Sequence, residues 1–306
     1  MNDLLSIIIP TYNEEKNISY IYQKIKESAG AFQYEIIFID DGSFDNTFNE
    51  IKHISDIDNQ AKGISFSRNF GHQIALLAGL NESKGDIVVM MDADGQHPAE
   101  LIPILIDKVK EGYDIVNTRR KTTEGIGFFK KVSSRFYYSF LNFLTDIKIE
   151  YSSSDFRAMT RKAVDAFLQL EETNRFTRGL ISWMGFNQAI VEYNAPKRYA
   201  GETKYTLKKM LRFGIDGITS FSAKPLKISF YFGLITLLLG VIYGIYAIAI
   251  YTLGKAIPGW TSILLTVLFI GGVQLLGIGI LGEYLAKIYN EIKGRPHYFI
   301  KNRCGK

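Results

Sequence analysis

Two carboxylates that lie one residue apart at the end of an apolar run could hold a metal ion. The run covers residues 87–91, and Asp92 and Asp94 follow it with Ala93 between them. Alternation along an extended chain places both carboxylates on the same side. Oxygen ligands of this kind suit a hard cation such as Mg²⁺ or Mn²⁺, which could in turn bind a diphosphate. A turn that only ends a strand is the structural alternative.

Three further polar clusters follow apolar runs, at residues 11–14, 40–41 and 68–69. Tyr12 offers an aromatic face to a nucleobase, and the carboxylates of Asp40 and Asp41 can accept hydrogen bonds from base N–H or ribose hydroxyl groups. The stretch from Asp41 to Ser43 also fits a turn in which Ser43 caps a helix. Together the four clusters favour a nucleotide site.

The elements that must position these clusters alternate along the chain. We expect strands at residues 6–10, 34–40, 63–67 and 86–91, and helices at 17–28, 45–57, 73–82 and 100–111. This order predicts an α/β domain with a mostly parallel sheet and helices on both faces. Ligands of such sheets bind outside the carboxyl ends of the strands, where all four clusters fall. The first strand lacks the glycine-rich turn of a dinucleotide site.

The C-terminal third differs in composition from the rest of the chain. Residues 226–253 contain one ionised side chain, Lys227, and a second uncharged run covers residues 260–282. Both runs are long enough to span a bilayer, whereas two buried helices of a soluble protein are the alternative. Lys and Arg flank the pair on both outer sides, so both ends should face the cytoplasm. The aromatic and basic segments 128–141 and 205–221 resemble helices that lie in the headgroup region.

Composition narrows the function classes. The 306 residues are 47% hydrophobic with a net charge of +5, and the basic residues gather beside the apolar runs, which indicates a membrane surface and no nucleic-acid partner. Cys304 is the single cysteine, so no intramolecular disulfide can form. No export signal is recognisable. We expect a protein of the inner membrane with a cytoplasmic domain at residues 1–225, two transmembrane helices within 226–290, and a basic cytoplasmic tail at 291–306.

Five motifs carry a resemblance to a known family. They are SIIIPTYNEE at residues 6–15, IDDGS at 39–43, SRNFG at 67–71, MDADGQHP at 91–98 and RYAGETKY at 198–205. In combination they resemble the family 2 glycosyltransferases, in particular the polyprenyl-phosphate glycosyltransferases of the bactoprenol glucosyltransferase and dolichol-phosphate mannosyltransferase type. The likeness runs through most of the chain.

The resemblance implies a GT-A fold, an α/β domain with a Rossmann-like, mostly parallel sheet, followed here by a two-helix transmembrane hairpin. It implies nucleotide-sugar binding by Pro10, Tyr12, Glu14, Asp41, Asp92, Ala93, Arg198 and Lys204. It also implies that Mg²⁺ or Mn²⁺ is held by Asp92, Asp94 and Gln96. A homo-oligomer, for example a tetramer, is expected, and a separate flippase is a candidate partner.

The acceptor chemistry follows from charge. A lipid monophosphate is largely dianionic near neutral pH, with a second pKa of about 6, so its oxygen attacks without a strong protein base. Cations must offset the repulsion between anionic donor and acceptor. The acceptor-side candidates are Arg119 and Lys130, which the resemblance places in the acceptor-side segment, and Arg135. Arg135, like the neighbouring basic residues Arg120 and Lys131, could equally be a surface charge. Asp94 and Asp155 are the candidate catalytic residues, Asp155 as an orienting group or a base.

We therefore predict an inverting transfer of a hexose from a nucleotide sugar, with UDP-glucose favoured, to undecaprenyl phosphate for modification of cell-envelope glycans. One alternative is a polysaccharide synthase, although the Gln-x-x-Arg-Trp segment of such enzymes is not found near residues 175–183. A second is a non-catalytic membrane scaffold or sugar-lipid carrier. A soluble transferase with a hydroxyl acceptor is a third, which the hairpin disfavours.

Overall fold

The computed structural model describes residues 3–121, 153–173, 175–196, 219, 222–253 and 259–305. Its first half alternates strands and helices as predicted, with boundaries within about two residues. The strands are β1 (Leu4–Thr11), β2 (Gln33–Asp40), β3 (Ala61–Phe66) and β4 (Ile87–Met90). The helices are α1 (Glu15–Ala29), α2 (Thr47–Ile57), α3 (His72–Glu82) and α4 (Ile102–Lys110), the last preceded by a 3₁₀ turn, η1 (Ala99–Leu101).

The later part of the domain is irregular in order. It contains β5 (Ile115–Arg120), β6 (Ser153–Thr160), α6 (Arg161–Leu168), α7 (Thr177–Trp183) and β7 (Gln188–Tyr193). The described strands form one sheet in the order β7-β5-β6-β4-β1-β2-β3-β8, where β8 is Ile300–Cys304. The strands β4, β1, β2 and β3 run parallel, whereas β6 and β8 are antiparallel to their neighbours. The sheet is therefore mostly parallel at its centre, as expected.

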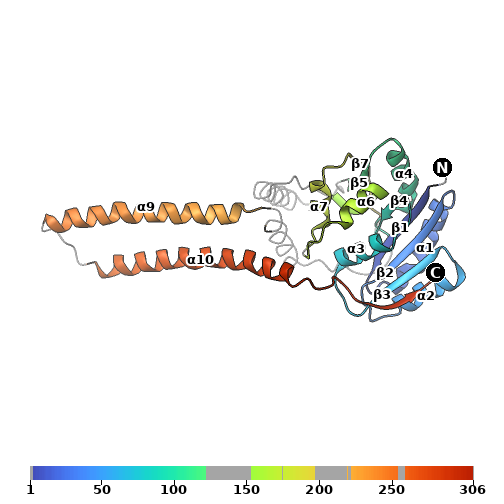
Figure 1. Cartoon of the computed structure of the whole chain (residues 1–306), viewed down its shortest axis with the longest axis horizontal. Helices are drawn as coiled ribbons and strands as arrows, with labels where there is room; N and C mark the ends of the chain where they lie inside the picture. The colour runs from blue at the N-terminus through green and yellow to red at the C-terminus, as the bar shows by residue number, and fades with distance from the viewer. Residues whose placement is uncertain are drawn as a thin grey trace.

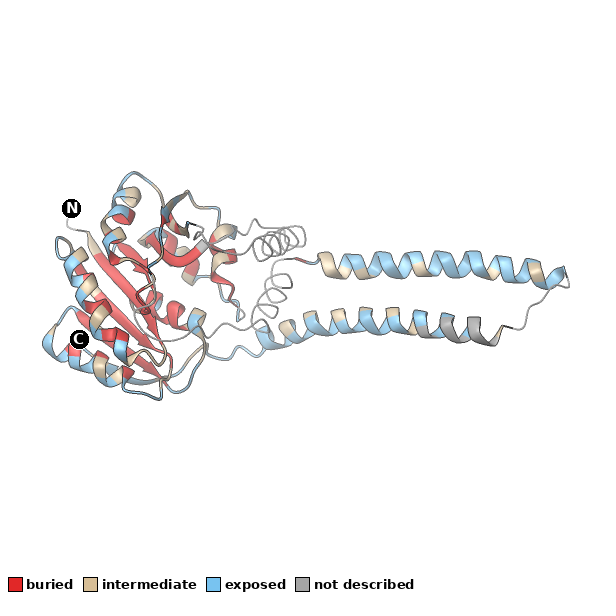
Figure 2. Cartoon of the chain, turned by 180° about the vertical axis from the view of Figure 1, so that it is seen from behind, coloured by how far each residue is buried: buried red, intermediate tan, exposed pale blue. Residues whose placement is uncertain are grey.

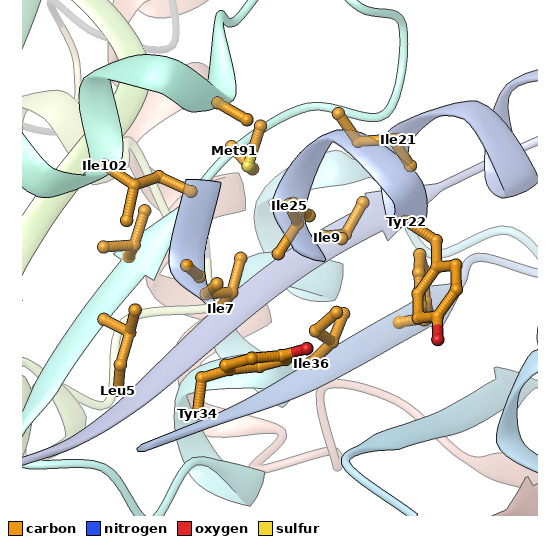
Figure 3. Packing of buried hydrophobic residues seen from close by; sticks show 14 of the residues in the cluster. Leu5, Ile7, Ile9, Ile21, Tyr22, Ile25, Tyr34, Ile36, Met91 and Ile102 are labelled. Atoms are coloured by element: carbon orange, nitrogen blue, oxygen red, sulfur yellow. The ribbon is translucent and has the colours of Figure 1, made fainter. Parts of the chain in front are cut away.

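Helices cover both faces of the sheet because the central strands are apolar on both sides (Figure 1; Figure 2). On one face, Ile7 and Ile9 of β1 pack in the same cluster as Ile21 and Ile25 of α1, which Figure 3 shows from close by. On the other face, Ile8 packs in a cluster that includes residues of α3, α6 and α7. Burial of each such side chain contributes about 1.5 to 3 kcal/mol, so the strand ends that carry polar groups are held on a rigid base.

Two long helices extend away from the sheet domain (Figure 1). They are α9 (Lys224–Thr252) and α10 (Trp260–Ile292), and within the described residues both contain stretches long and apolar enough to cross a membrane. Most of the apolar residues whose burial is described in these helices are exposed to the surroundings (Figure 2). Such a surface is costly in water and suits a hydrocarbon environment. The prediction of two apolar helices is confirmed, and α10 extends ten residues beyond the predicted end of the run.

The chain returns to the sheet after α10. Residues 291–306 were predicted to be a separate basic tail, but Ile300–Cys304 forms β8 and pairs antiparallel with β3. Its sequence, IKNRC, lacks the apolar alternation that marks a strand, because most of its side chains face solvent at the edge of the sheet. The sheet domain therefore contains strands that precede α9 and one strand that follows α10.

Candidate functional site

The loop after β4 presents the paired carboxylates and is fixed by a buried histidine. The backbone N–H of Asp92 donates to Nδ1 of His97 at 2.8 Å, and the N–H of Gln96 donates to Oδ1 of Asp94 at 2.9 Å. His97 stacks on Phe156 with ring centroids 5.2 Å apart, and burial lowers the pKa of the imidazole. The loop shape is thus set by side chains beneath it.

The donor atoms of this loop fit a hard divalent cation. Oδ1 of Asp92 is buried without a hydrogen-bond partner, and its nearest cation is Nε2 of His72 at 3.5 Å. Asp94 is 8% exposed. In the described parts of the chain no group of three or more His, Cys, Asp or Glu side chains could hold a metal. A site with two carboxylates and few other protein ligands suits Mg²⁺, because this ion keeps coordination positions open for substrate phosphates.

The predicted donor-side clusters are brought together by strand register. Thr11 at the end of β1 pairs with Asp40 at the end of β2, and the N–H of Asp41 donates to the carbonyl of Thr11 at 2.9 Å. The loop after β1 is tied to the next one, because the N–H of Asn13 donates to Oγ of Ser43 at 2.9 Å. Pro10 is buried, whereas Tyr12 and Glu14 are half-buried beside this junction.

The two neighbouring aspartates after β2 have different partners. Asp40 accepts from the N–H of Ser43 at 3.0 Å and from Oγ of Ser65 at 2.7 Å, so it holds the turn. Ser43 therefore belongs to that turn and is not the cap of α2, which begins at Thr47 after Asn46. Asp41 instead faces the loop after β3 and accepts from the N–H groups of Phe70 and Gly71 at 2.6 and 2.9 Å.

Asp41 should make folding stability depend on pH in a mildly acidic window. Burial raises the pKa of its carboxyl to about 6, despite the two backbone hydrogen bonds that act in the opposite sense. When folding raises the pKa of an acid, its contribution to stability is greatest below the pKa of the unfolded chain, here about 4. That contribution is lost as the pH rises through the pKa of the folded protein, here about 6. We expect this contribution, up to about 3 kcal/mol, to vanish in Asp41→Asn. Unfolding of both proteins between pH 4.5 and 7 measures it; parallel curves would contradict the assignment.

A second carboxylate, Asp155 on β6, lies in a network of cations. Its two oxygens contact Nε and Nη2 of Arg178 at 3.0 and 3.1 Å, and Oδ1 also contacts Arg157 at 3.3 Å. Nε2 of His72 lies 3.6 Å from Oδ2. Burial opposes the charge on Asp155, but Arg178 and His72 lower the pKa of the carboxyl well below its usual value.

His72 connects this network to the paired carboxylates. Its imidazole lies between Asp155 and Asp92. Loss of hydration lowers the pKa of the imidazole, but the two carboxylates raise it by more, so that the pKa is raised to about 9. A paired carboxylate with a lowered pKa is a weak proton acceptor, so the geometry favours Asp155 as an orienting group over a base. The sequence prediction missed His72 and Arg178; His72 directly follows the SRNFG motif, which was the available signal.

The predicted acceptor cations are only partly within the described residues. Arg119 on β5 pairs with Glu192 on the surface, through Nε at 3.2 Å and Nη2 at 2.8 Å. Its neighbour Arg120 points the other way and reaches Tyr193 at 3.2 Å and the amide oxygen of Gln96 at 3.4 Å. Arg120 therefore contacts the loop that bears Asp92 and Asp94. The remaining predicted cations lie outside the described residues: Lys130, Lys131 and Arg135 on the acceptor side, and Arg198 and Lys204 on the donor side.

Comparison with known proteins gives two family matches. Residues 6–168 match glycosyl transferase family 2, and residues 224–288 match the GtrB C-terminal hairpin. An uncharacterised glycosyltransferase of Bacillus subtilis (strain 168) is 44% identical over 304 residues, which cover 98% of this chain and 94% of the relative. A bactoprenol glucosyl transferase of Shigella phage SfX is 39% identical over 302 residues, covering 98% and 99%.

Among solved structures, glucosyl-3-phosphoglycerate synthase from Mycobacterium tuberculosis in complex with Mn²⁺, UDP-glucose and phosphoglyceric acid is 20% identical. The superposition has a TM-score of 0.46 and covers 71% of this chain and 78% of the synthase chain.

Proposed function

Because the chain belongs to glycosyl transferase family 2, we propose that it transfers glucose from UDP-glucose to a polyprenyl phosphate with inversion at the anomeric carbon. The observation that carries the proposal is the position of Asp92 and Asp94. They follow a central strand of the sheet, beside the loops that bear Tyr12 and Asp41, in a chain that also has two exposed apolar helices. A relative named for glucosyl transfer to bactoprenol supports the acceptor class.

The donor would bind across the loops at the carboxyl ends of β1, β2 and β4. In this proposal Tyr12 and Asp41 would contact the base and ribose, and Pro10, Glu14 and Ala93 would line the same edge. Arg198 and Lys204 would bind the phosphates. Asp92 and Asp94, with Gln96, would hold the cation. When bound, Mg²⁺ or Mn²⁺ would offset the negative charge of the departing nucleoside diphosphate.

The acceptor step needs positioned charges more than a base. An oxygen of the lipid phosphate attacks the anomeric carbon as the bond from that carbon to UDP breaks, and UDP leaves with the electron pair. Attack from the face opposite to UDP inverts the configuration. His72, which contacts both Asp92 and Asp155, would supply fixed positive charge next to Asp92, and Arg178 would add positive charge beside Asp155. Arg119, Arg120, Lys130 and Arg135 are the proposed contacts for the lipid phosphate.

Membrane placement follows from the path of the chain. If α9 and α10 cross the bilayer, the chain leaves and re-enters the sheet domain on one side, because β8 pairs with β3. Charge flanking the helices supports the cytoplasmic side of the inner membrane. A homo-oligomer and a flippase partner complete the proposal.

A donor panel tests the function. Purified full-length protein is incubated with undecaprenyl phosphate and radiolabelled UDP-glucose, UDP-N-acetylglucosamine or GDP-mannose, with Mn²⁺, Mg²⁺ or EDTA. We expect labelled lipid only from UDP-glucose, and none in EDTA. A water-soluble polymer would indicate a polysaccharide synthase, transfer without lipid a hydroxyl-acceptor enzyme, and nucleotide binding without product a scaffold; each result would refute the proposal.

A further inference from the structure

The segment that joins α10 to β8 lies against the loop that follows β3. The ring of Tyr298 stacks on Phe66 with centroids 4.9 Å apart and planes 24° from parallel. The backbone carbonyl of Phe299 accepts a hydrogen bond from the N–H of Ser67 at 2.9 Å. The ring of Phe299 lies 6.4 Å from that of Phe70. Residues 294–299, here termed the return segment, therefore contact both ends of the loop formed by residues 67–71.

The same loop supplies both hydrogen bonds to the carboxylate of Asp41. The N–H groups of Phe70 and Gly71 are its donors, at 2.6 and 2.9 Å. Phe70 packs edge-on against Phe66 at 5.7 Å, and the guanidinium of Arg68 lies over the ring of Phe70 at 4.1 Å. A continuous set of contacts thus runs from Tyr298 through Phe66 and Phe70 to Asp41, far from the return segment in sequence.

The return segment is fixed on both sides. Before it, the carboxylate of Glu291 near the end of α10 accepts from the N–H of Thr173 at 2.9 and 3.0 Å. After it, β8 pairs with β3, and Arg303 forms a two-pronged ion pair with Glu82 at 2.8 and 2.9 Å. A segment tied down at both ends can hold a neighbouring loop in one shape.

We propose that Tyr298 is a positioning residue for the nucleotide donor, which acts by holding residues 67–71 in the conformation that fixes Asp41. The inference rests on the proposed function, since it gives Asp41 a role in donor binding. Loss of the ring would let the loop adopt other shapes, and a donor that binds one shape would then bind more weakly. The transfer step itself should change less than donor binding, because the ring of Tyr298 stacks on Phe66, and no contact with the carboxylate of Asp92 or Asp155 is found in the described part of the chain.

The test compares Tyr298→Leu, which keeps apolar bulk, with Tyr298→Phe, which keeps the ring. In full-length protein we expect Y298L to raise the KM for UDP-glucose and the Kd for UDP with Mn²⁺ roughly three- to tenfold. The change in kcat should be smaller, although residues 67–71 lead directly into His72. Y298F keeps the ring but loses the hydrogen bond between the Tyr298 hydroxyl and Asn81 on α3, so it should stay much closer to wild-type values than Y298L does. Lys301→Ala, an exposed side chain on β8, is the matched control and should have no effect.

Amide hydrogen exchange in nucleotide-free protein separates this inference from the proposed function. Y298L should accelerate exchange at Phe70 and Gly71, whereas Y298F and K301A should not. A Y298L protein that melts lower but keeps the wild-type Kd and exchange rates would overturn the inference, because Tyr298 would then only fill space. If Y298L fails to fold, Phe299→Ala, which alters a mostly exposed ring, should give the same changes at about twofold. Absence of transfer in the wild type would refute the function without affecting the exchange comparison.

Discussion

Asp94→Ala is expected to lower the rate of sugar transfer by roughly a hundred- to a thousandfold, the scale of losing one group that stabilises charge on a leaving group. Asp94 is nearly buried, and the N–H of Gln96 holds one of its oxygens in place. Alanine removes a proposed cation ligand without disturbing the partner of Asp92, which is His97. Initial rates with saturating UDP-glucose and Mn²⁺ measure the loss.

Asp107→Ala is the matched control, because this carboxylate is exposed on α4. It should retain the wild-type rate and the wild-type dependence on Mn²⁺ concentration. A D94A protein that works at a normal rate, or that responds to Mn²⁺ as the wild type does, would refute the assignment of Asp94 to the cation.

Asp155→Ala is expected to lower the free energy of unfolding by about 3 to 5 kcal/mol, the usual cost of removing one partner from a buried ion pair. Asp155 is 9% exposed and Arg157 is 1% exposed, so the substitution leaves Arg157 buried without its carboxylate. It also releases Arg178 and His72. Thermal or denaturant unfolding of purified protein in detergent measures the change.

Asp165→Ala provides the comparison, since Asp165 pairs with Arg161 on the surface at 3.6 Å and such pairs contribute about 0.5 kcal/mol. If D155A is no less stable than D165A, the network around Asp155 does not hold the site together. Asp155→Asn, which preserves the shape of the side chain, distinguishes an orienting group from a general base. If Asp155 orients, the D155N protein should keep the acid limb of the pH–rate profile, whereas loss of that limb in D155N would identify Asp155 as a base.

The first half of the fold was predictable because each central strand is a short apolar run followed by polar residues, a pattern that local sequence fully displays. The GT-A fold and the two apolar helices are confirmed by the family matches and the sheet. β5, β6 and β7 were not predicted, and β8 was taken for tail. β8 shows the reason most clearly: Lys301 and Arg303 face solvent, so only pairing with β3 makes the segment a strand.

The candidate site was predictable to the extent that it lies at strand ends. The convergence of Tyr12, Asp41 and Asp92 follows from parallel pairing of β1 with β2 and β4. The partners of Asp155, the other candidate carboxylate, were not predictable in the same way. Arg178 on α7 meets Asp155 on β6 only through packing of distant elements, and a lone arginine in a sequence carries no sign of such a partner.

A structure of the full-length protein with UDP and Mn²⁺, with anomalous scattering to locate manganese, tests the central claim most directly. We expect manganese within coordination distance of the Asp94 carboxylate and the diphosphate, with the uracil and ribose beside Tyr12 and Asp41. Manganese and nucleotide bound away from the carboxyl ends of β1, β2 and β4 would contradict the proposed site and the mechanism built on it.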